Sequence, residues 1–418
     1  MKIKKGAHAA CKKSNGLFIF SASLGLAVLL FWGTCKSSPG VKGIFAGVAN
    51  VFIIADDGSL WSAGYNRSGQ LGFENNGGQD MPAGIFQIKQ NGKGFTGVKS
   101  VAAGENHTVI VKDDGTLWAV GESLYGELGL GGDGSAKLSG LTRLEMTGVR
   151  YAAAGNNSTF VIKDDGTLWA AGYNFYGELG LGNRENMAAF TQVTGAGKDV
   201  KAVAAGARHT VILKNDGTVW AAGYNFNGQL GLGNTEDTVQ FTQVRSIGAG
   251  SSAVAAGNYH TVILKSDGTV WSAGENFYGQ LGWSDAADRN QFAQVQDDKG
   301  QAINNAKDIA ARGNLTLVHK KDNALLLAGS FADPVPRDEN NLPPEKQGGD
   351  SKSSFVPLEA EKDNTAALKD IKKVVLGNQS IYVIAGKNQL LAAGSNRYGQ
   401  LNQSYDTDTI VKLKSIYP

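Results

Sequence analysis

The chain has 418 residues, of which 42% are hydrophobic and 57 are glycine, so it is too rich in glycine for an ordinary globular chain and too apolar for a disordered one. The formal net charge of +2 includes five lysines in the first sixteen residues, and without them 35 basic residues face 38 acidic ones. This balance excludes the basic surface that binding to a phosphate backbone requires, so we expect no nucleic-acid partner.

Residues 1–34 are predicted to be an export signal. Lysines precede an apolar run from Leu17 to Trp32, and small residues follow it up to Cys35. The segment resembles a bacterial lipoprotein signal, which implies that Cys35 is acylated; an uncleaved signal anchor and plain secretion are the alternatives. Residues 35–40 form a tether. We therefore expect the folded part to lie outside the cytoplasm, either held at the membrane of a bacterial cell envelope or secreted.

Residues 41–418 contain seven repeats. Tryptophan recurs at one repeat position, and leucine replaces it in repeats six and seven; the residues are Trp61, Trp118, Trp169, Trp220, Trp271, Leu326 and Leu391. Each is followed three residues later by a glycine. Repeats of about 50 residues that contain short strands and no helical period predict an all-β fold, a seven-bladed β-propeller in which the glycines mark turns.

Each repeat has the same internal order, which is clearest in the fourth. His209–Lys214 alternates as a strand does, Asp216 and Gly217 form the predicted two-residue hairpin loop, and Thr218–Ala222 is the predicted return strand. A further short strand at Phe241–Val244 closes the repeat.

The pattern VAAGxxHT…DGT[LV]WxAGxNxxGQLGxG resembles the repeat of the regulator of chromosome condensation family, whose known fold is a seven-bladed β-propeller. The resemblance covers nearly everything after residue 40 and is strongest in five repeats. The founding member of that family is a nucleotide-exchange factor for a small GTPase and binds chromatin through a basic tail, which an export signal replaces here. Another relative is a secreted inhibitor that grips β-lactamases with aromatic loops on one rim. The resemblance therefore implies a protein partner.

Three recurring residue types have structural interpretations. His107, His209 and His260 share one repeat position and are predicted to bond to local backbone, because no cysteine or carboxylate shares a metal-ligand spacing with them. The aspartates before the hairpin glycines are predicted to shape turns, and the tryptophans to pack between blades. We expect no metal, no cofactor and no enzymatic activity.

The variable residues between the repeat's asparagine and its GQLG glycine are the candidate binding residues. Repeat symmetry places them on one rim of the ring, and their aromatic and arginine side chains are typical of protein-binding surfaces. They are Arg67, Leu124, Tyr125, Phe175, Tyr176, Phe226, Phe277, Tyr278, Arg397 and Tyr398. In the alternative interpretation the first aromatic of each pair packs into its own blade. The neighbouring asparagines are expected to fix the loops.

The end of the chain departs from the regular period. Residues 331–370 form an insertion in the sixth repeat that holds five of the eight prolines, and we expect a partly disordered surface loop there. Thr409–Ser415 matches the closing strand of a repeat. If blade and repeat boundaries are offset, the two ends of the chain meet in one blade.

Three functions are compatible with these observations. The first is an extracytoplasmic, lipid-anchored and monomeric module that binds a protein partner through one rim. The second is a hydrolase, acting for example on glycans, that uses the central channel of the ring. The third is a structural envelope protein without enzymatic activity.

Overall fold

The structure is a computed structural model that describes residues 40–73, 84–331, 352–360, 367–394 and 412–415. By internal contacts the chain divides into two units, residues 1–39 and 40–418. The first unit, with the predicted export signal and Cys35, lies outside the described residues. In the part of the chain that is described, no helix is long and apolar enough to cross a membrane.

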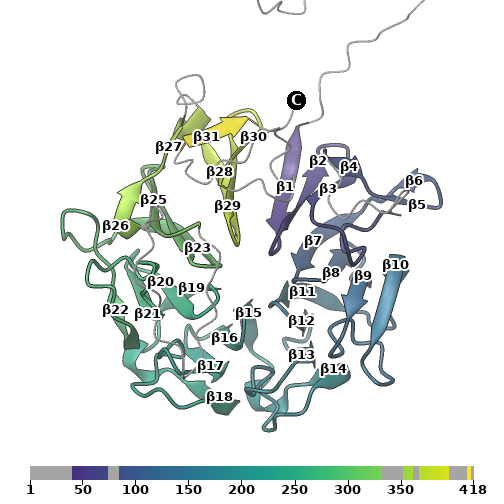
Figure 1. The fold of residues 1–418 in the computed structure, drawn as a ribbon, viewed down its shortest axis with the longest axis horizontal. Helices are drawn as coiled ribbons and strands as arrows, with labels where there is room; N and C mark the ends of the chain where they lie inside the picture. The colour runs from purple at the N-terminus through teal and green to yellow at the C-terminus, as the bar shows by residue number, and fades with distance from the viewer. Residues whose placement is uncertain (1–39, 74–83, 332–351, 361–366, 395–411, 416–418) are drawn as a thin grey trace, which may run out of the picture. The chain divides into compact units, whose positions relative to one another are not determined.

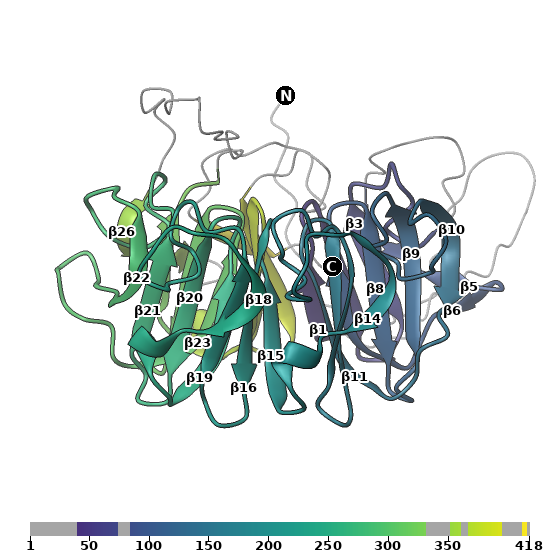
Figure 2. The ribbon, with the colours of Figure 1, turned by 90° about the horizontal axis from the view of Figure 1, so that it is seen from below.

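Seven sheets, one for each repeat, surround a central axis as the blades of a β-propeller (Figure 1). In each of the first six blades, four antiparallel strands follow one another in the chain, from the innermost to the outermost. The strands run between the two faces of the ring (Figure 2). The predicted fold class is therefore confirmed.

The innermost strands are β1 (Val41–Ala46), β7 (Val98–Ala103), β11 (Val149–Ala154), β15 (Val200–Ala205), β19 (Ser251–Ala256), β23 (Ala306–Arg312) and β28 (Ile371–Gly377). The second strands are β2 (Asn50–Ala55), β8 (His107–Lys112), β12 (Ser158–Lys163), β16 (His209–Lys214), β20 (His260–Lys265), β24 (Leu315–Lys320) and β29 (Ser380–Ala385). The third strands are β3 (Leu60–Gly64), β9 (Leu117–Ser123), β13 (Leu168–Gly172), β17 (Val219–Gly223), β21 (Val270–Gly274), β25 (Leu325–Gly329) and β30 (Gln389–Gly394). The outer strands are β4 (Phe86–Gln87), β10 (Ala136–Arg143), β14 (Met187–Gln192), β18 (Thr238–Gln243), β22 (Arg289–Gln294), β26 (Lys352–Pro357) and β31 (Lys412–Ser415).

A few short elements complete the described chain. A two-stranded hairpin, β5 (Lys89–Gln90) and β6 (Lys93–Gly94), follows blade one. Short 3-10 helices lie at Thr194–Ala196, Arg245–Ile247 and Ala367–Lys369.

The hairpin of blade four departs from the prediction in one respect. Its loop contains three residues, Asn215 to Gly217, and not two, because the Lys214 N–H donates to the Thr218 carbonyl at 3.0 Å. Gly217 has φ +79°, the left-handed conformation that ends a three-residue hairpin loop at little cost for glycine. Strand β16 has the predicted bounds, β17 begins and ends one residue later than predicted, and the closing strand β18 begins three residues earlier than predicted and ends one residue earlier.

The aspartate, threonine and tryptophan of this hairpin form one hydrogen-bonded unit. The Asp216 carboxylate accepts the N–H and the hydroxyl of Thr218 at 2.8 and 2.7 Å. The Thr218 oxygen in turn accepts the indole N–H of Trp220 at 3.1 Å. Equivalent bonds occur in blades one, two, three and five, so the aspartates shape turns as predicted.

The core consists of seven apolar clusters, one at each junction between neighbouring blades. Each of the five repeat tryptophans packs between its own blade and the preceding one; Trp220, for example, joins the cluster that contains Leu179 and Val203. This confirms the predicted packing role. Gly231 lies against the ring of Phe292 from the next blade, where a Cβ atom would overlap the ring. Close approach between blades thus explains part of the high glycine content.

Blades one and seven meet through a cluster of the same kind. Val41 and Ile44 of β1 pack with Tyr382 and Ile384 of β29. Within the described residues no blade combines strands from both ends of the ring; the first described strand, β1, and the last, β31, lie in adjacent blades. β31 supplies the closing strand predicted near residue 415.

Part of the predicted insertion at 331–370 belongs to the ring. Strand β26 is the outer strand of blade six, and β27 (Glu359–Ala360) pairs in parallel with β31 of blade seven. Residues 332–351 and 361–366, where the loop was expected, lie outside the described residues.

Candidate functional site

A buried asparagine fixes each rim loop in blades three and four. Asn225 accepts the Leu230 N–H at 2.9 Å and donates to the carbonyls of Asn234 and Glu236 at 3.1 Å. Asn174 holds the preceding loop in the same way. The predicted loop-fixing role is confirmed, and the residue that follows each asparagine is directed outward.

The candidate rim residues differ in exposure. The first residue of three pairs is the most exposed, with Leu124, Phe175 and Phe226 at 53, 57 and 54%. These three therefore do not pack into their own blades. Arg67 and Tyr125 are also exposed, whereas Tyr176, Phe277 and Tyr278 are half-buried. Arg397 and Tyr398 lie outside the described residues.

Seven of the rings on this rim form a continuous band across blades two to five. We call it the aromatic arc; its members are Tyr125, Tyr173, Phe175, Tyr176, Tyr224, Phe226 and Tyr259. Neighbouring rings contact one another across blade junctions, with centroids 4.9 Å apart for Tyr125 and Tyr173, 4.9 Å for Tyr176 and Tyr224, and 6.0 Å for Tyr224 and Tyr259. Most of these contacts are edge-to-face, the arrangement that aromatic rings prefer. Phe277 and Tyr278 contact each other edge to face in blade five, with ring centroids 4.9 Å apart.

Sequence reasoning did not identify three of the tyrosines or the arginine at the centre of the arc. Tyr173 and Tyr224 directly follow the marker glycine of their repeats, and Arg208 and Tyr259 directly precede the repeat histidine. Both are variable positions within a constant frame, the same signal that identified the rim pairs. The guanidinium of Arg208 lies 5.0 Å from the Tyr176 ring centroid and donates to its hydroxyl at 3.0 Å.

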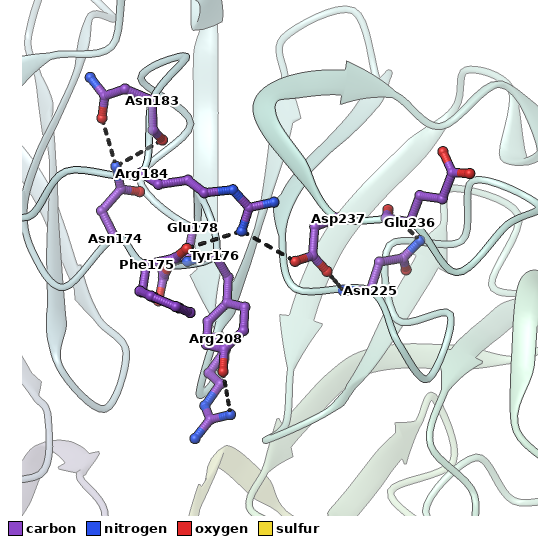
Figure 3. Close-up of polar contacts among 10 residues, drawn as sticks. All are labelled: Asn174, Phe175, Tyr176, Glu178, Asn183, Arg184, Arg208, Asn225, Glu236 and Asp237. Atoms are coloured by element: carbon purple, nitrogen blue, oxygen red, sulfur yellow. Dashed lines mark hydrogen bonds and ion pairs between the residues drawn. The ribbon is translucent and has the colours of Figure 1, made fainter. Parts of the chain in front are cut away.

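A second arginine links the rim loops of blades three and four. Arg184 donates to the Phe175 carbonyl at 3.0 Å and pairs with Asp237 at 3.4 Å. Figure 3 shows Arg184 lying between the two loops and Arg208 at the Tyr176 hydroxyl. The loop that carries Phe175 and Tyr176 is thus held on both sides, so its rings are fixed before any partner binds.

Glu178 is a buried acid beneath the arc. It stands where Gln229 and Gln280 stand in the next two repeats, and one of its oxygens accepts the Tyr176 N–H at 2.9 Å. The other oxygen is buried without a partner among the described residues. Burial raises the pKa of Glu178 to about 7, although the charge of Arg208 acts in the opposite direction.

The repeat histidines bind the neighbouring blade, not local backbone as predicted. The Nε2 atom of His209 lies 3.0 Å from the hydroxyl of Thr261, which itself donates to the Gln229 carbonyl at 2.7 Å. Because the threonine proton is used there, the histidine donates from Nε2. His107 and His260 make the same bond to the next blade. Burial lowers the pKa to about 4 for His107 and His209 and to about 3 for His260.

The central channel has a different chemistry from the rim. The innermost strands enclose a cavity of about 290 Å³ that is lined almost entirely by alanine and other apolar residues. Arg312 crosses it from blade six and donates to the carbonyls of Ala103 and Ala154 at 3.0 and 3.4 Å. Burial lowers the pKa of Arg312 to about 10. Among the described residues, no group of three or more histidine, cysteine or acidic side chains is placed to hold a metal.

The described repeats match two models of the Regulator of chromosome condensation (RCC1) repeat. One matches residues 98–127, 149–178, 200–229 and 252–280, and the other matches 57–111, 165–213 and 216–264. The matched segments contain the aromatic arc and its loops.

Two curated relatives share part of this sequence. The chain is 32% identical to the Ultraviolet-B receptor of Arabidopsis thaliana over 257 residues, which cover 60% of the chain and 56% of the receptor. It is 36% identical to the Secretion-regulating guanine nucleotide exchange factor of Bos taurus over 129 residues, which cover 30% of the chain and 28% of that factor. The match thus spans about half the length of the receptor and a smaller part of the exchange factor.

Solved structures share the fold. Yeast RCC1 (Prp20), crystallised with Kap60 bound, superposes with a TM-score of 0.68 and 19% identity over 90% of this chain and 84% of that one. Human WBSCR16 superposes equally well, with 18% identity over 85% of this chain and 93% of that one.

Proposed function

Because the chain belongs to the regulator of chromosome condensation repeat family of β-propellers, we propose that it is a binding module without enzymatic activity that holds a protein partner on the aromatic arc. The observation that carries this proposal is the continuity of the arc, in which rings from blades two to five contact one another on one rim and Tyr125, Phe175 and Phe226 are exposed. Aromatic residues and arginine are enriched where protein partners bind. The bound Kap60 of the yeast protein and the name of the bovine exchange factor support a protein partner.

The rim loops are suited to binding because their shape is already fixed. Buried asparagines, Arg184 and the ring contacts hold them in place, so little conformational entropy is lost when a partner binds. We expect the module to act as a monomer that presents this one rim.

The channel gives less support to the alternative of a glycan hydrolase. Hydrolysis of a glycosidic bond commonly uses two carboxylates that flank it. The described channel lining contains one tyrosine, Tyr151, and one arginine, Arg312, among apolar residues, and no carboxylate. This lining favours the binding module over the hydrolase.

We place the module outside the cytoplasm, anchored through acylated Cys35. The support for this placement is the order of lysines, apolar run and cysteine at the N-terminus. Globomycin treatment or a Cys35→Ala variant tests it. We expect both to change gel mobility and to alter membrane fractionation, and unchanged behaviour in both would exclude a lipid anchor.

Site-specific photo-crosslinking in the cells that make the protein tests the binding function. A photoreactive amino acid is placed at Phe175 or Phe226 on the arc, and as a matched control at Asn215, an exposed residue of the hairpin loop at the opposite end of the strands. We expect the two arc positions to give the same protein adduct and the control position to give none. Absence of an adduct from both arc positions, or an equal yield at Asn215, would contradict the proposal.

A further inference from the structure

The centre of the rim contains a pocket whose chemistry suggests what part of a partner it receives. It has a volume of about 260 Å³, and blades two to five all contribute to it. Tyr125, Tyr173 and Tyr259 of the aromatic arc line it, together with Asn156. Arg208 and Glu105 are the two charged residues of its lining. The pocket is therefore a polar recess within an aromatic rim.

Arg208 is held firmly at its backbone. It lies in the turn between β15 and β16, where the Ala207 N–H donates to the Asn258 carbonyl at 3.2 Å. The Arg208 carbonyl accepts the Tyr224 N–H at 2.9 Å. These bonds tie the turn to the next blade and to the arc, so the guanidinium reaches the pocket from a fixed position.

The guanidinium of Arg208 has few partners for its hydrogen-bonding capacity. Its one described side-chain hydrogen bond goes to the hydroxyl of Tyr176 and not to a carboxylate. Among the described residues, the ion pairs within 4.0 Å involve Arg184, Lys214, Arg289 and Lys320, and Arg208 is in none of them. A guanidinium carries five N–H donors in a planar fork that fits a carboxylate with two parallel bonds.

We propose that this pocket binds a carboxylate of the protein partner, with the Arg208 guanidinium as its anchor and the tyrosines of the arc enclosing it. The proposal rests on the proposed function, because it assigns the chemistry of the partner at the same rim. Tyrosine rings shield the charge pair from water, which strengthens the interaction. The carboxylate belongs either to an aspartate or glutamate side chain or to the C-terminus of the partner chain.

Glu105 limits the site to a single acidic group. It is an exposed residue in the same pocket lining, and the partial loss of water around its carboxyl, together with the charge of Glu127, raises the pKa of that carboxyl. When Glu105 is ionised it repels an incoming carboxylate, so its removal is expected to strengthen binding. An arginine that attracts and a glutamate that repels give two substitutions with opposite expected effects in one pocket.

The test uses the full chain in detergent micelles with ¹⁵N-labelled arginine, and follows the Nε–Hε NMR signal of Arg208. Three pentapeptides serve as probes. The first has a central aspartate and both ends blocked, the second is a neutral peptide with a free C-terminal carboxylate, and the third is the blocked asparagine counterpart of the first. We expect at least one of the carboxylate peptides to shift the signal saturably and the asparagine peptide to leave it unchanged. Comparison of the first two identifies the source of the carboxylate.

Variants then separate the roles of the charged residues. We expect Arg208→Gln to weaken the affinity for the carboxylate peptide about 10- to 100-fold, as the loss of a charged hydrogen-bond pair predicts. Glu105→Gln should strengthen it several-fold. Arg289→Gln is the matched control, since Arg289 pairs with Asp285 and lies outside the lining of this pocket, and it should leave affinity unchanged. For the variants, affinity is read by titration calorimetry.

Clear outcomes would overturn the inference. They are no response of the Arg208 signal to either carboxylate peptide, an equal response to the asparagine peptide, or full affinity in Arg208→Gln. If Arg208→Gln does not fold, Arg208→Lys keeps the charge but loses the fork, and full affinity in that variant would also count against the pocket. Photo-crosslinks at Phe175 without any peptide response would exclude the pocket and leave the binding function standing. A peptide response without crosslinks would support the pocket and contradict the binding of a protein partner at Phe175 and Phe226.

Discussion

The bonds from histidine to threonine between blades predict how the stability of the propeller depends on pH. His107, His209 and His260 are buried and neutral, and each donates from Nε2 to a threonine of the next blade. Their pKa values in the folded state, about 4 for the first two and about 3 for the third, lie below the ordinary value of 6.5. The unfolded chain therefore binds more protons than the folded one as the pH falls below 6.5, and the folded state loses stability.

The magnitude follows from these values. At pH 5 each histidine lowers the free energy of unfolding by about 2 kcal/mol relative to pH 7.5, because the unfolded histidine is mostly protonated and the folded one is not. The three together amount to about 6 kcal/mol if they titrate independently.

The assay is urea unfolding at pH 7.5 and pH 5.0, followed by tyrosine and tryptophan fluorescence. The control variant replaces all three histidines with asparagine, the residue that blade one has at this position as Asn50. We expect the control to be less stable at pH 7.5 but to lose about 6 kcal/mol less on acidification. Other titrating groups, including Glu178, contribute equally to both proteins and cancel. A difference below about 2 kcal/mol, or one of opposite sign, would refute neutral histidines bonded between blades.

Three further predictions concern the buried acid, a loop glycine and the channel arginine. The pKa of Glu178 in the folded state is about 7, above its ordinary value of 4.5, so its contribution to stability is complete below pH 4.5 and is lost as the pH rises through 7. Glu178→Gln should therefore raise the free energy of unfolding by about 2 kcal/mol at pH 8 and by less at pH 5. An equal effect at both pH values would contradict this. Gly231→Ala should lower the free energy of unfolding in urea by about 2–4 kcal/mol, because the new Cβ atom overlaps the ring of Phe292. Gly58 has a similar φ and open space around it, so Gly58→Ala should lower it by only about 1 kcal/mol. Equal losses would show that the loop of Gly231 relaxes. Arg312→Gln should raise the pKa of His107 in an NMR titration, since the charge of Arg312 adds to burial in lowering it, and an unchanged midpoint would mean that burial acts alone.

The number of blades and the hairpin in each repeat could be predicted because they depend on local chemistry. The turn aspartate, its threonine and the tryptophan lie within five residues of one another, so a short stretch such as Asp216 to Trp220 contains the whole unit. The three-residue loop was missed because an Asp-Gly pair fits both loop lengths, and the register is decided by the bond from Lys214 to Thr218.

Contacts between blades were harder to predict because they join residues about one repeat apart. His209 and Thr261 lie 52 positions apart, and nothing near His209 indicates its partner. Arg208 was missed for the same reason, because the tyrosines that line the pocket with it belong to three other blades. Arg312 stands where the other six repeats have glycine, but the sequence does not reveal that it crosses the channel. The rim pairs were identified because variable residues stand out against a repeating frame.

The bond from histidine to threonine is missing at the junction of blades three and four, and we expect this junction to open more readily than those that have the bond. Ser158 takes the histidine position in blade three, and the hydroxyl of Thr210, its counterpart in blade four, is buried without a partner among the described residues. This junction lies below the contact between Tyr176 and Tyr224 at the middle of the aromatic arc. We expect the strands to separate locally at this junction before they do at the junctions that have the bond, whereas the rim loops above it stay held by Arg184 and the ring contacts. We therefore expect faster amide hydrogen exchange in β15 than in β19.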